Sequence, residues 1–118
     1  MSFAATPDPP YYAVIFTSLR SDADLHGYEL MAAKMAKLSA AMQGYLGIES
    51  ARDSEGVGIT VSYWDSEAAI LAWKQHAVHL LAQATGKERW YEHYEVRVAK
   101  VERAYRGPEG RAISTSSA

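Results

Sequence analysis

The sequence predicts one α+β domain whose elements follow the order β-α-β-β-α-β. Residues 11–19 are a near-continuous run of strand-forming apolar residues, and residues 59–64 alternate with a period of two. Residues 25–42 and 67–84 instead place apolar side chains at steps of three and four, which is the period of an amphipathic helix. A chain of 118 residues is long enough to bury a single core.

The N-terminal half begins with residues 1–10, a proline-rich stretch that we expect to be a flexible arm. The strand over residues 11–19 is apolar on both faces, which is typical of a central strand. The helix that follows carries an apolar stripe consisting of Leu25, Tyr28, Met31, Met35, Leu38 and Met42. This stripe is explained either by core packing or by an adaptable binding surface. Gly44 is suited to end the helix in the left-handed conformation.

The middle of the chain is predicted to form a hairpin. A strand over residues 45–53 leads into a polar turn, in which Gly56 supplies the positive φ that such turns need. The next strand ends at Trp64. Ser66 is suited to cap the second helix, and Gly86 is suited to end it.

The last strand contains Tyr94, Val96 and Val98 on one face. A three-residue slip in its apolar pattern predicts a bulge near residues 99–100. The domain therefore spans residues 11–106. Residues 107–118 are small and polar, so we expect a disordered tail.

This element order predicts the ferredoxin-like fold, in which two helices cover one face of a four-stranded antiparallel sheet. The strands are apolar on both faces, so the second face needs a cover that no remaining element supplies. We therefore predict a homodimer in which two sheets meet face to face.

The composition excludes several classes of function. A net charge of −2 gives no general attraction to nucleic acid or to an anionic membrane. No segment approaches the roughly 20 apolar residues of a membrane span, and the N-terminus has no signal-peptide pattern. The absence of cysteine removes thiolate nucleophiles, disulfides and Cys-ligated metals. We expect a cytoplasmic protein.

Two pairs of residues around the second helix are candidate site residues. Trp64 and Trp73 could hold a planar substrate, or could simply fill the space between helix and sheet. His76 and His79 lie three residues apart on a polar stripe beside the buried helix face. A third metal ligand is not evident, so we expect no metal site. Either histidine could instead act as an acid or base, and the other interpretation is a solvated flank.

A third group of candidates lies on the last strand. The group consists of Tyr91, His93, Tyr94 and Arg97. Tyr91 and Tyr94 could donate hydrogen bonds to a developing phenolate or peroxide oxygen, and Arg97 could hold an anionic oxygen. The alternative is that they are interface aromatics and exposed charges.

The chain resembles the antibiotic biosynthesis monooxygenase family from about Tyr11 to Arg106. The resemblance rests on the segments YYAVIFTS, GYLGIESAR, GITVSYWDSEAAILAWKQHAVHLLAQ and WYEHYEVRVAKVER. It implies a dimeric α+β barrel with a pocket between the sheet and the helices of each subunit. It also implies either cofactor-independent oxygenation of aromatic molecules or haem degradation, and many members of the family have no known role.

Several positions distinguish the haem-degrading members of the family from the cofactor-independent ones. Haem-degrading members carry a tryptophan that Trp73 matches, and a proximal histidine nearly three turns further on. The chain has Ala82, Gln83 and Ala84 there, and it contains no asparagine to match the pocket asparagine of those members. We therefore expect no cofactor, with haem held by His76 or His79 as the alternative.

The resulting hypothesis is a monooxygenase, and so an oxidoreductase, acting on an aromatic or electron-rich organic molecule. His76 or His79 would accept a proton, and Trp64 and Trp73 would hold the ring. A non-catalytic ligand-binding dimer of the same fold is the second hypothesis, and a haem-binding oxygenase is the third.

Overall fold

The structure is a computed structural model that describes residues 3–23, 25–83, 90–108 and 111–112. The elements are β1 (Tyr11–Arg20), α1 (Leu25–Ala40), β2 (Tyr45–Arg52), β3 (Val57–Trp64), α2 (Glu67–Gln83), β4 (Tyr91–Val101), β5 (Tyr105–Arg106) and β6 (Arg111–Ala112). The predicted order of the six main elements is confirmed.

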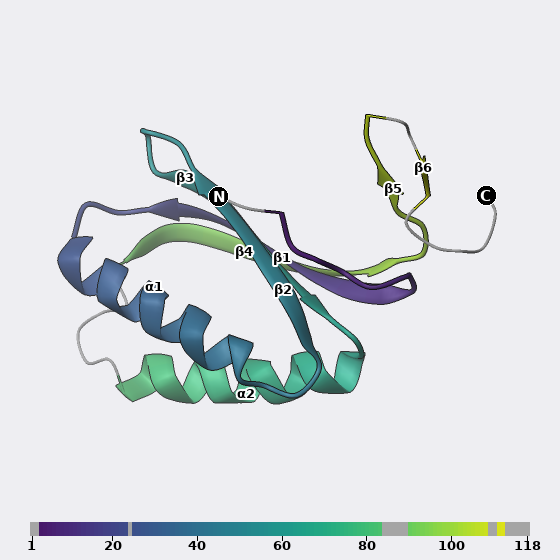
Figure 1. The fold of residues 1–118 in the computed structure, drawn as a ribbon. Helices are drawn as coiled ribbons and strands as arrows, with labels where there is room; N and C mark the ends of the chain where they lie inside the picture. The colour runs from purple at the N-terminus through teal and green to yellow at the C-terminus, as the bar shows by residue number, and fades with distance from the viewer. Residues whose placement is uncertain (1–2, 24, 84–89, 109–110, 113–118) are drawn as a thin grey trace.

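The main sheet has the strand order β2-β3-β1-β4, and all neighbouring strands are antiparallel. Both helices lie on the same face of this sheet, which we call the helix side (Figure 1). The fold is therefore the ferredoxin-like α+β arrangement that the sequence predicts. We call the opposite face the far face.

Local chemistry explains where the elements begin and end. Gly44 and Gly56 adopt φ of 91° and 94°, so the two predicted left-handed glycines are confirmed. The hydroxyl of Ser66 accepts a hydrogen bond from the Ala69 amide at 3.1 Å, which caps α2 as expected. The amide of Asp65 donates to the Gly44 carbonyl at 2.9 Å and thereby ties the start of α2 to the end of α1.

The sequence misplaced the bulge of the last strand. β4 pairs with β1 in unbroken register from Val101 to His93, and the irregularity lies between Leu19 and Arg20 instead. The predicted slip near residues 99–100 has a simpler cause. Val98 lies opposite Val14 on the helix side, whereas Val101 lies opposite Tyr11 on the far face. The apolar positions belong to two faces of a regular strand.

The N-terminal arm contacts the far face. The Ala4 amide donates to the Glu49 carboxylate at 2.9 Å, and the Tyr63 hydroxyl donates to the other oxygen of that carboxylate at 2.7 Å. Beyond the arm, Val57 and Ile59 are 46% and 48% exposed on the same face. The far face is thus covered at one end and bare at the other.

A short hairpin of β5 and β6 extends away from the helices (Figure 1). Its second strand lies within the segment that the sequence predicted to be disordered. Residues 113–118 of that segment and residues 1–2 of the arm lie outside the described residues. In the described part of the chain, no helix combines the length and the apolar character needed to cross a bilayer.

We predict that Gly44→Ala destabilises the fold by roughly 2–4 kcal/mol. A Cβ at this position would lie 2.6 Å from the Ala69 Cβ and 2.6 Å from an Asp65 carboxylate oxygen, in a conformation that L residues rarely adopt. Urea unfolding followed by circular dichroism measures the loss. Gly107→Ala is the control, because a Cβ there meets nothing within 4 Å. Equal stability of the two variants would contradict the prediction.

Candidate functional site

Four aromatic side chains form a cluster at the C-terminal end of β3, which we call the tryptophan cluster: Tyr45, Trp64, Trp73 and His76. Trp64 is fully buried, and its indole nitrogen donates to the Ser62 hydroxyl at 2.9 Å. Trp73 comes from α2 and stacks on Trp64 with ring centroids 6.3 Å apart. The two tryptophans that the sequence named as candidates therefore pack on each other, and of the two only Trp73 is partly exposed.

The predicted polar stripe of α2 begins beside this stack. His76 is exposed, and its ring lies 5.8 Å from that of Trp73. Ile70 and Ala77, on the predicted buried stripe, are half-buried. The arrangement sets a titratable imidazole at the edge of an aromatic stack. The side chain of His79, the second predicted acid or base, lies outside the described residues.

A second cluster lies at the other end of the helix side, and sequence reasoning missed its central members. We call it the arginine cluster: Ser18, Arg20, Tyr28, Arg52 and Tyr91. The Arg52 guanidinium donates to the Ser18 hydroxyl at 2.8 Å, to the Tyr28 hydroxyl at 3.2 Å and to the Gly56 carbonyl. The guanidinium carbons of Arg20 and Arg52 lie 5.2 and 5.6 Å from the centroid of the Tyr28 ring.

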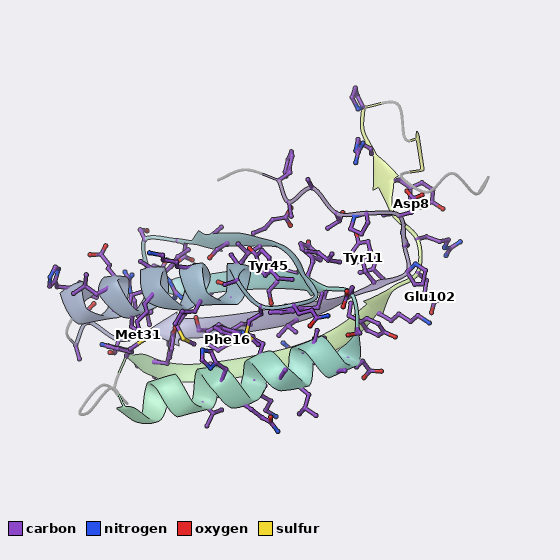
Figure 2. All side chains as sticks on the ribbon, turned by 60° about the horizontal axis from the view of Figure 1, so that its bottom comes forward. Asp8, Tyr11, Phe16, Met31, Tyr45 and Glu102 are labelled. Carbon is purple, nitrogen blue, oxygen red and sulfur yellow. The ribbon has the colours of Figure 1, made fainter. Side chains whose placement is uncertain are left out.

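Tyr91 and Tyr94, predicted from the last strand, both reach the helix side. Tyr91 makes an edge contact with Tyr28 at 5.7 Å and with Phe16 at 5.2 Å, and Tyr94 stacks on Phe16 at 5.5 Å. Figure 2 shows Phe16 on this side of the sheet. Burial raises the pKa of Tyr91 well above its usual value, and the neighbouring Tyr28 raises it further. Tyr91 is therefore a neutral phenol that can donate a hydrogen bond.

Arg97 lies elsewhere. It is on the far face, where it forms an ion pair with Glu95, and His93 contacts the same carboxylate at 3.1 Å. The hydrogen bond from His93, followed by the charge of Arg97, lowers the pKa of Glu95. These three exposed side chains line a shallow depression of about 190 Å³ with Thr17, Leu19 and Val57. The structure thus does not bring Arg97 together with Tyr91 and Tyr94.

The far face also holds a perturbed tyrosine. Burial and the hydrogen bond to Glu49 raise the pKa of Tyr63 to about 12. The Tyr11 ring meets the Tyr63 ring edge-on at 5.8 Å. Glu49 also accepts a hydrogen bond from the Ala4 amide and so holds the arm. We therefore explain the contact between Tyr63 and Glu49 by its structural role. Within the residues that the structure describes, no three His, Asp or Glu side chains are grouped as metal ligands would be.

Comparison with known proteins agrees with this architecture. The family model described as antibiotic biosynthesis monooxygenase matches residues 10–85. The chain belongs to the antibiotic biosynthesis monooxygenase family. The matched residues include β1, α1, the β2–β3 hairpin and α2, and so the whole tryptophan cluster.

Two relatives match most of this chain. The uncharacterized protein YqjZ of Bacillus subtilis is 54% identical over 98 residues, which cover 83% of this chain and 85% of that protein. Jasmonate monooxygenase ABM of Pyricularia oryzae is 27% identical over 111 residues, covering 91% of this chain. The match covers 51% of that enzyme, so this chain spans about half of its length.

A solved structure shares the fold at low identity. It is a variant of SnoaB from Streptomyces nogalater, a cofactor-independent oxygenase. The TM-score is 0.59 at 14% identity, and the match covers 77% of this chain and 92% of that one.

We predict that Tyr63→Phe removes one tyrosine from the step near pH 12 in an alkaline titration followed by absorbance at 295 nm. The pKa of Tyr63 is about 12 in the folded protein and about 10 in an unfolded chain. The folded state therefore favours the neutral phenol, and its stabilising contribution is complete below pH 10 and lost as the pH rises through 12.

The control for this titration is Tyr105→Phe, because Tyr105 is 53% exposed on the projecting hairpin. It should leave the step near pH 12 unchanged. A Glu49→Gln variant should move the Tyr63 step to lower pH, because the carboxylate that accepts the hydrogen bond from the phenol is gone. An unchanged step near pH 12 in Tyr63→Phe would show that the contact to Glu49 does not form in solution.

Proposed function

We propose that this protein is a cofactor-independent oxygenase acting on a small aromatic or otherwise electron-rich molecule. The observation that carries the proposal is the stack of Trp64 and Trp73 with His76 at its edge. Family membership supports the reaction class, and the description of SnoaB as a cofactor-independent oxygenase supports the chemistry. The monooxygenase relative from Pyricularia oryzae supports an organic substrate.

In the proposed reaction the substrate supplies the electrons, and the protein supplies a proton acceptor, orientation and hydrogen bonds. His76 accepts a proton from an acidic C–H group of the substrate, and the resulting carbanion transfers electrons to O₂. Carbon–oxygen bond formation gives a peroxide, whose collapse leaves a carbonyl group and releases water. All four electrons that reduce O₂ come from the substrate, so no external reductant is needed. The protein contributes orientation of the ring by Trp73 and hydrogen bonding by a neutral phenol such as Tyr91.

We also propose that the protein works as a cytoplasmic homodimer. The bare end of the far face presents Val57 and Ile59 at 46% and 48% exposure, next to Leu19 on the neighbouring strand. An apolar sheet face of this kind is stable when a second sheet covers it. A second copy of the chain supplies an identical face, as a two-fold symmetric interface requires.

We predict that His76→Ala lowers substrate-dependent O₂ uptake by roughly 100-fold or more, because it removes the proton acceptor. Trp73→Ala should weaken substrate binding and lower kcat/KM. An oxygen electrode with a panel of polycyclic phenols and anthrones measures both. Gln75→Ala is the matched control, since Gln75 is an exposed neighbour of His76 on α2 without an aromatic contact to Trp73. Equal rates for His76→Ala and Gln75→Ala would reject the role of His76.

A haemin titration separates the alternatives. We expect no saturable absorbance change, and oxygen uptake that survives dialysis against a chelator. Stoichiometric haemin binding lost in His76→Ala or His79→Ala would replace this proposal with a haem-dependent one. Ligand binding without oxygen uptake for any member of the panel would leave a non-catalytic binding dimer.

We predict that Ile59→Glu converts a dimer into a monomer, because a buried unpaired carboxylate costs several kcal/mol at an apolar interface. Light scattering after size exclusion measures the number of chains per particle. Val78→Glu is the matched control, because Val78 is 58% exposed on α2 and lies away from the far face. A monomeric wild-type protein, or a dimer in both variants, would contradict the prediction.

A further inference from the structure

Two cations converge on one aromatic ring in the arginine cluster. Arg20 comes from the end of β1, Arg52 from the end of β2, and Tyr28 from the first turn of α1. Both guanidinium carbons lie within 6 Å of the Tyr28 ring centroid, at 5.2 and 5.6 Å. All three side chains are half-buried, so solvent screens the repulsion between the two charges only in part.

Neither cation has an anionic partner in the described part of the chain. The ion pairs found there join Glu95 to His93 and Arg97, on the far face of the sheet. A half-buried pair of like charges without a counter-ion is unfavourable. The first turn of α1 adds the positive end of a helix dipole at Tyr28. Among the described residues, the two guanidinium groups and the start of α1 together favour an anion.

The hydrogen-bonding groups are also incompletely used. Arg52 has five N–H groups, and three hydrogen bonds to described residues hold its position: those to Ser18, Tyr28 and Gly56. The remaining N–H groups of Arg52, and the guanidinium of Arg20, have no hydrogen-bond acceptor among the described residues. Arg52 is therefore held in one position while some of its N–H groups remain available to a ligand. A preorganised anion-binding site has these two properties.

The surroundings of the cluster determine what kind of anion fits. Tyr91 and Phe16 lie in contact with each other next to Tyr28, and Tyr94 and Val96 beside them are 56% and 52% exposed. This surface matches an apolar or aromatic body and does not match a bare inorganic ion. We propose that Arg20 and Arg52 bind the carboxylate of a small organic acid whose apolar body lies on these side chains. The inference rests on the proposed function in naming this acid as the substrate.

Isothermal titration calorimetry with two matched probes tests the site. 1-Naphthylacetate and 1-naphthylacetamide share one aromatic body and differ in charge. We expect the acid to bind at least about tenfold more tightly than the amide. A hydrogen bond to a charged group contributes more free energy than a neutral one, and the difference corresponds to this ratio of affinities. Higher salt should weaken only the binding of the acid, and inorganic sulfate at equal ionic strength should compete poorly.

Arg20→Gln is the decisive variant, because the Arg20 side chain makes a ring contact but no hydrogen bond to the described residues, so the fold should survive its loss. It should abolish the preference for the acid. Arg52→Lys keeps the positive charge but loses the paired N–H donors of the guanidinium, so it should weaken the preference for the acid. Arg103→Gln is the control for net charge: Arg103 is exposed beyond the end of β4, and the preference should remain. Thermal unfolding by circular dichroism checks that each variant is folded.

The outcomes separate this site from the oxygenase chemistry. A preference for the acid that Arg20→Gln abolishes supports the anion site, whether or not the protein consumes oxygen. Equal binding of the two probes, or a preference that persists in folded Arg20→Gln, overturns it even if oxygen uptake is observed. In that last case the oxygenase proposal stands and its substrate needs no carboxylate.

Discussion

The guanidinium group of Arg52 is the contact on which the helix side of the sheet depends. It joins the Gly56 carbonyl in the β2–β3 turn, the Ser18 hydroxyl on β1 and the Tyr28 hydroxyl on α1. This position is available only because Gly58 lies opposite Arg52 in β3, where a Cβ would come within 2.6 Å of the guanidinium carbon. A glycine inside a central strand weakens it, and here the absence of a side chain makes room for the charge.

The interior of the protein depends on aromatic contacts more than on aliphatic packing. The buried apolar side chains in the described residues are Tyr11, Ala13, Trp64 and Trp90. On the helix side the rings form two separate groups, one around Trp64 and Trp73 and the other around Phe16 and Tyr91. Aromatic side chains expose faces that can hold a ligand while their edges pack against neighbours. A thin core and a ligand surface are thus consequences of the same residues.

The sequence predicted the elements and part of the site because those features are local. Helical spacing placed Trp73 on the buried stripe, and the period of two placed Trp64 at the end of a strand. The same period of two places Tyr94 and Arg97 on opposite faces of the strand. The sequence alone therefore argued against placing both residues in one site. The arginine cluster was harder to foresee. The β2–β3 hairpin sets Arg52 opposite Gly58, but Ser18 joins them only through the long-range register of β1 with β3.

The two clusters are connected by the direction of α2. This helix runs from the end of β3, at the tryptophan cluster, towards the start of β4, at the arginine cluster (Figure 1). From the start of α2, Trp73 lies roughly 9 Å and His76 roughly 14 Å along its axis, at 1.5 Å per residue. The six residue steps along β1 from Tyr12, opposite Trp64, to Ser18 span roughly 20 Å.

Along this direction His76 lies about one turn nearer to the arginine cluster than Trp73 does. The carboxylate of the proposed acid would lie at Arg20 and Arg52, and its apolar body on Phe16 and Tyr91 beside them. A ligand that also reached Trp73 would need a length on the order of 10 Å from the arginine cluster. The bound carboxylate would thus set the direction in which the substrate lies, and so limit which of its carbons can approach His76.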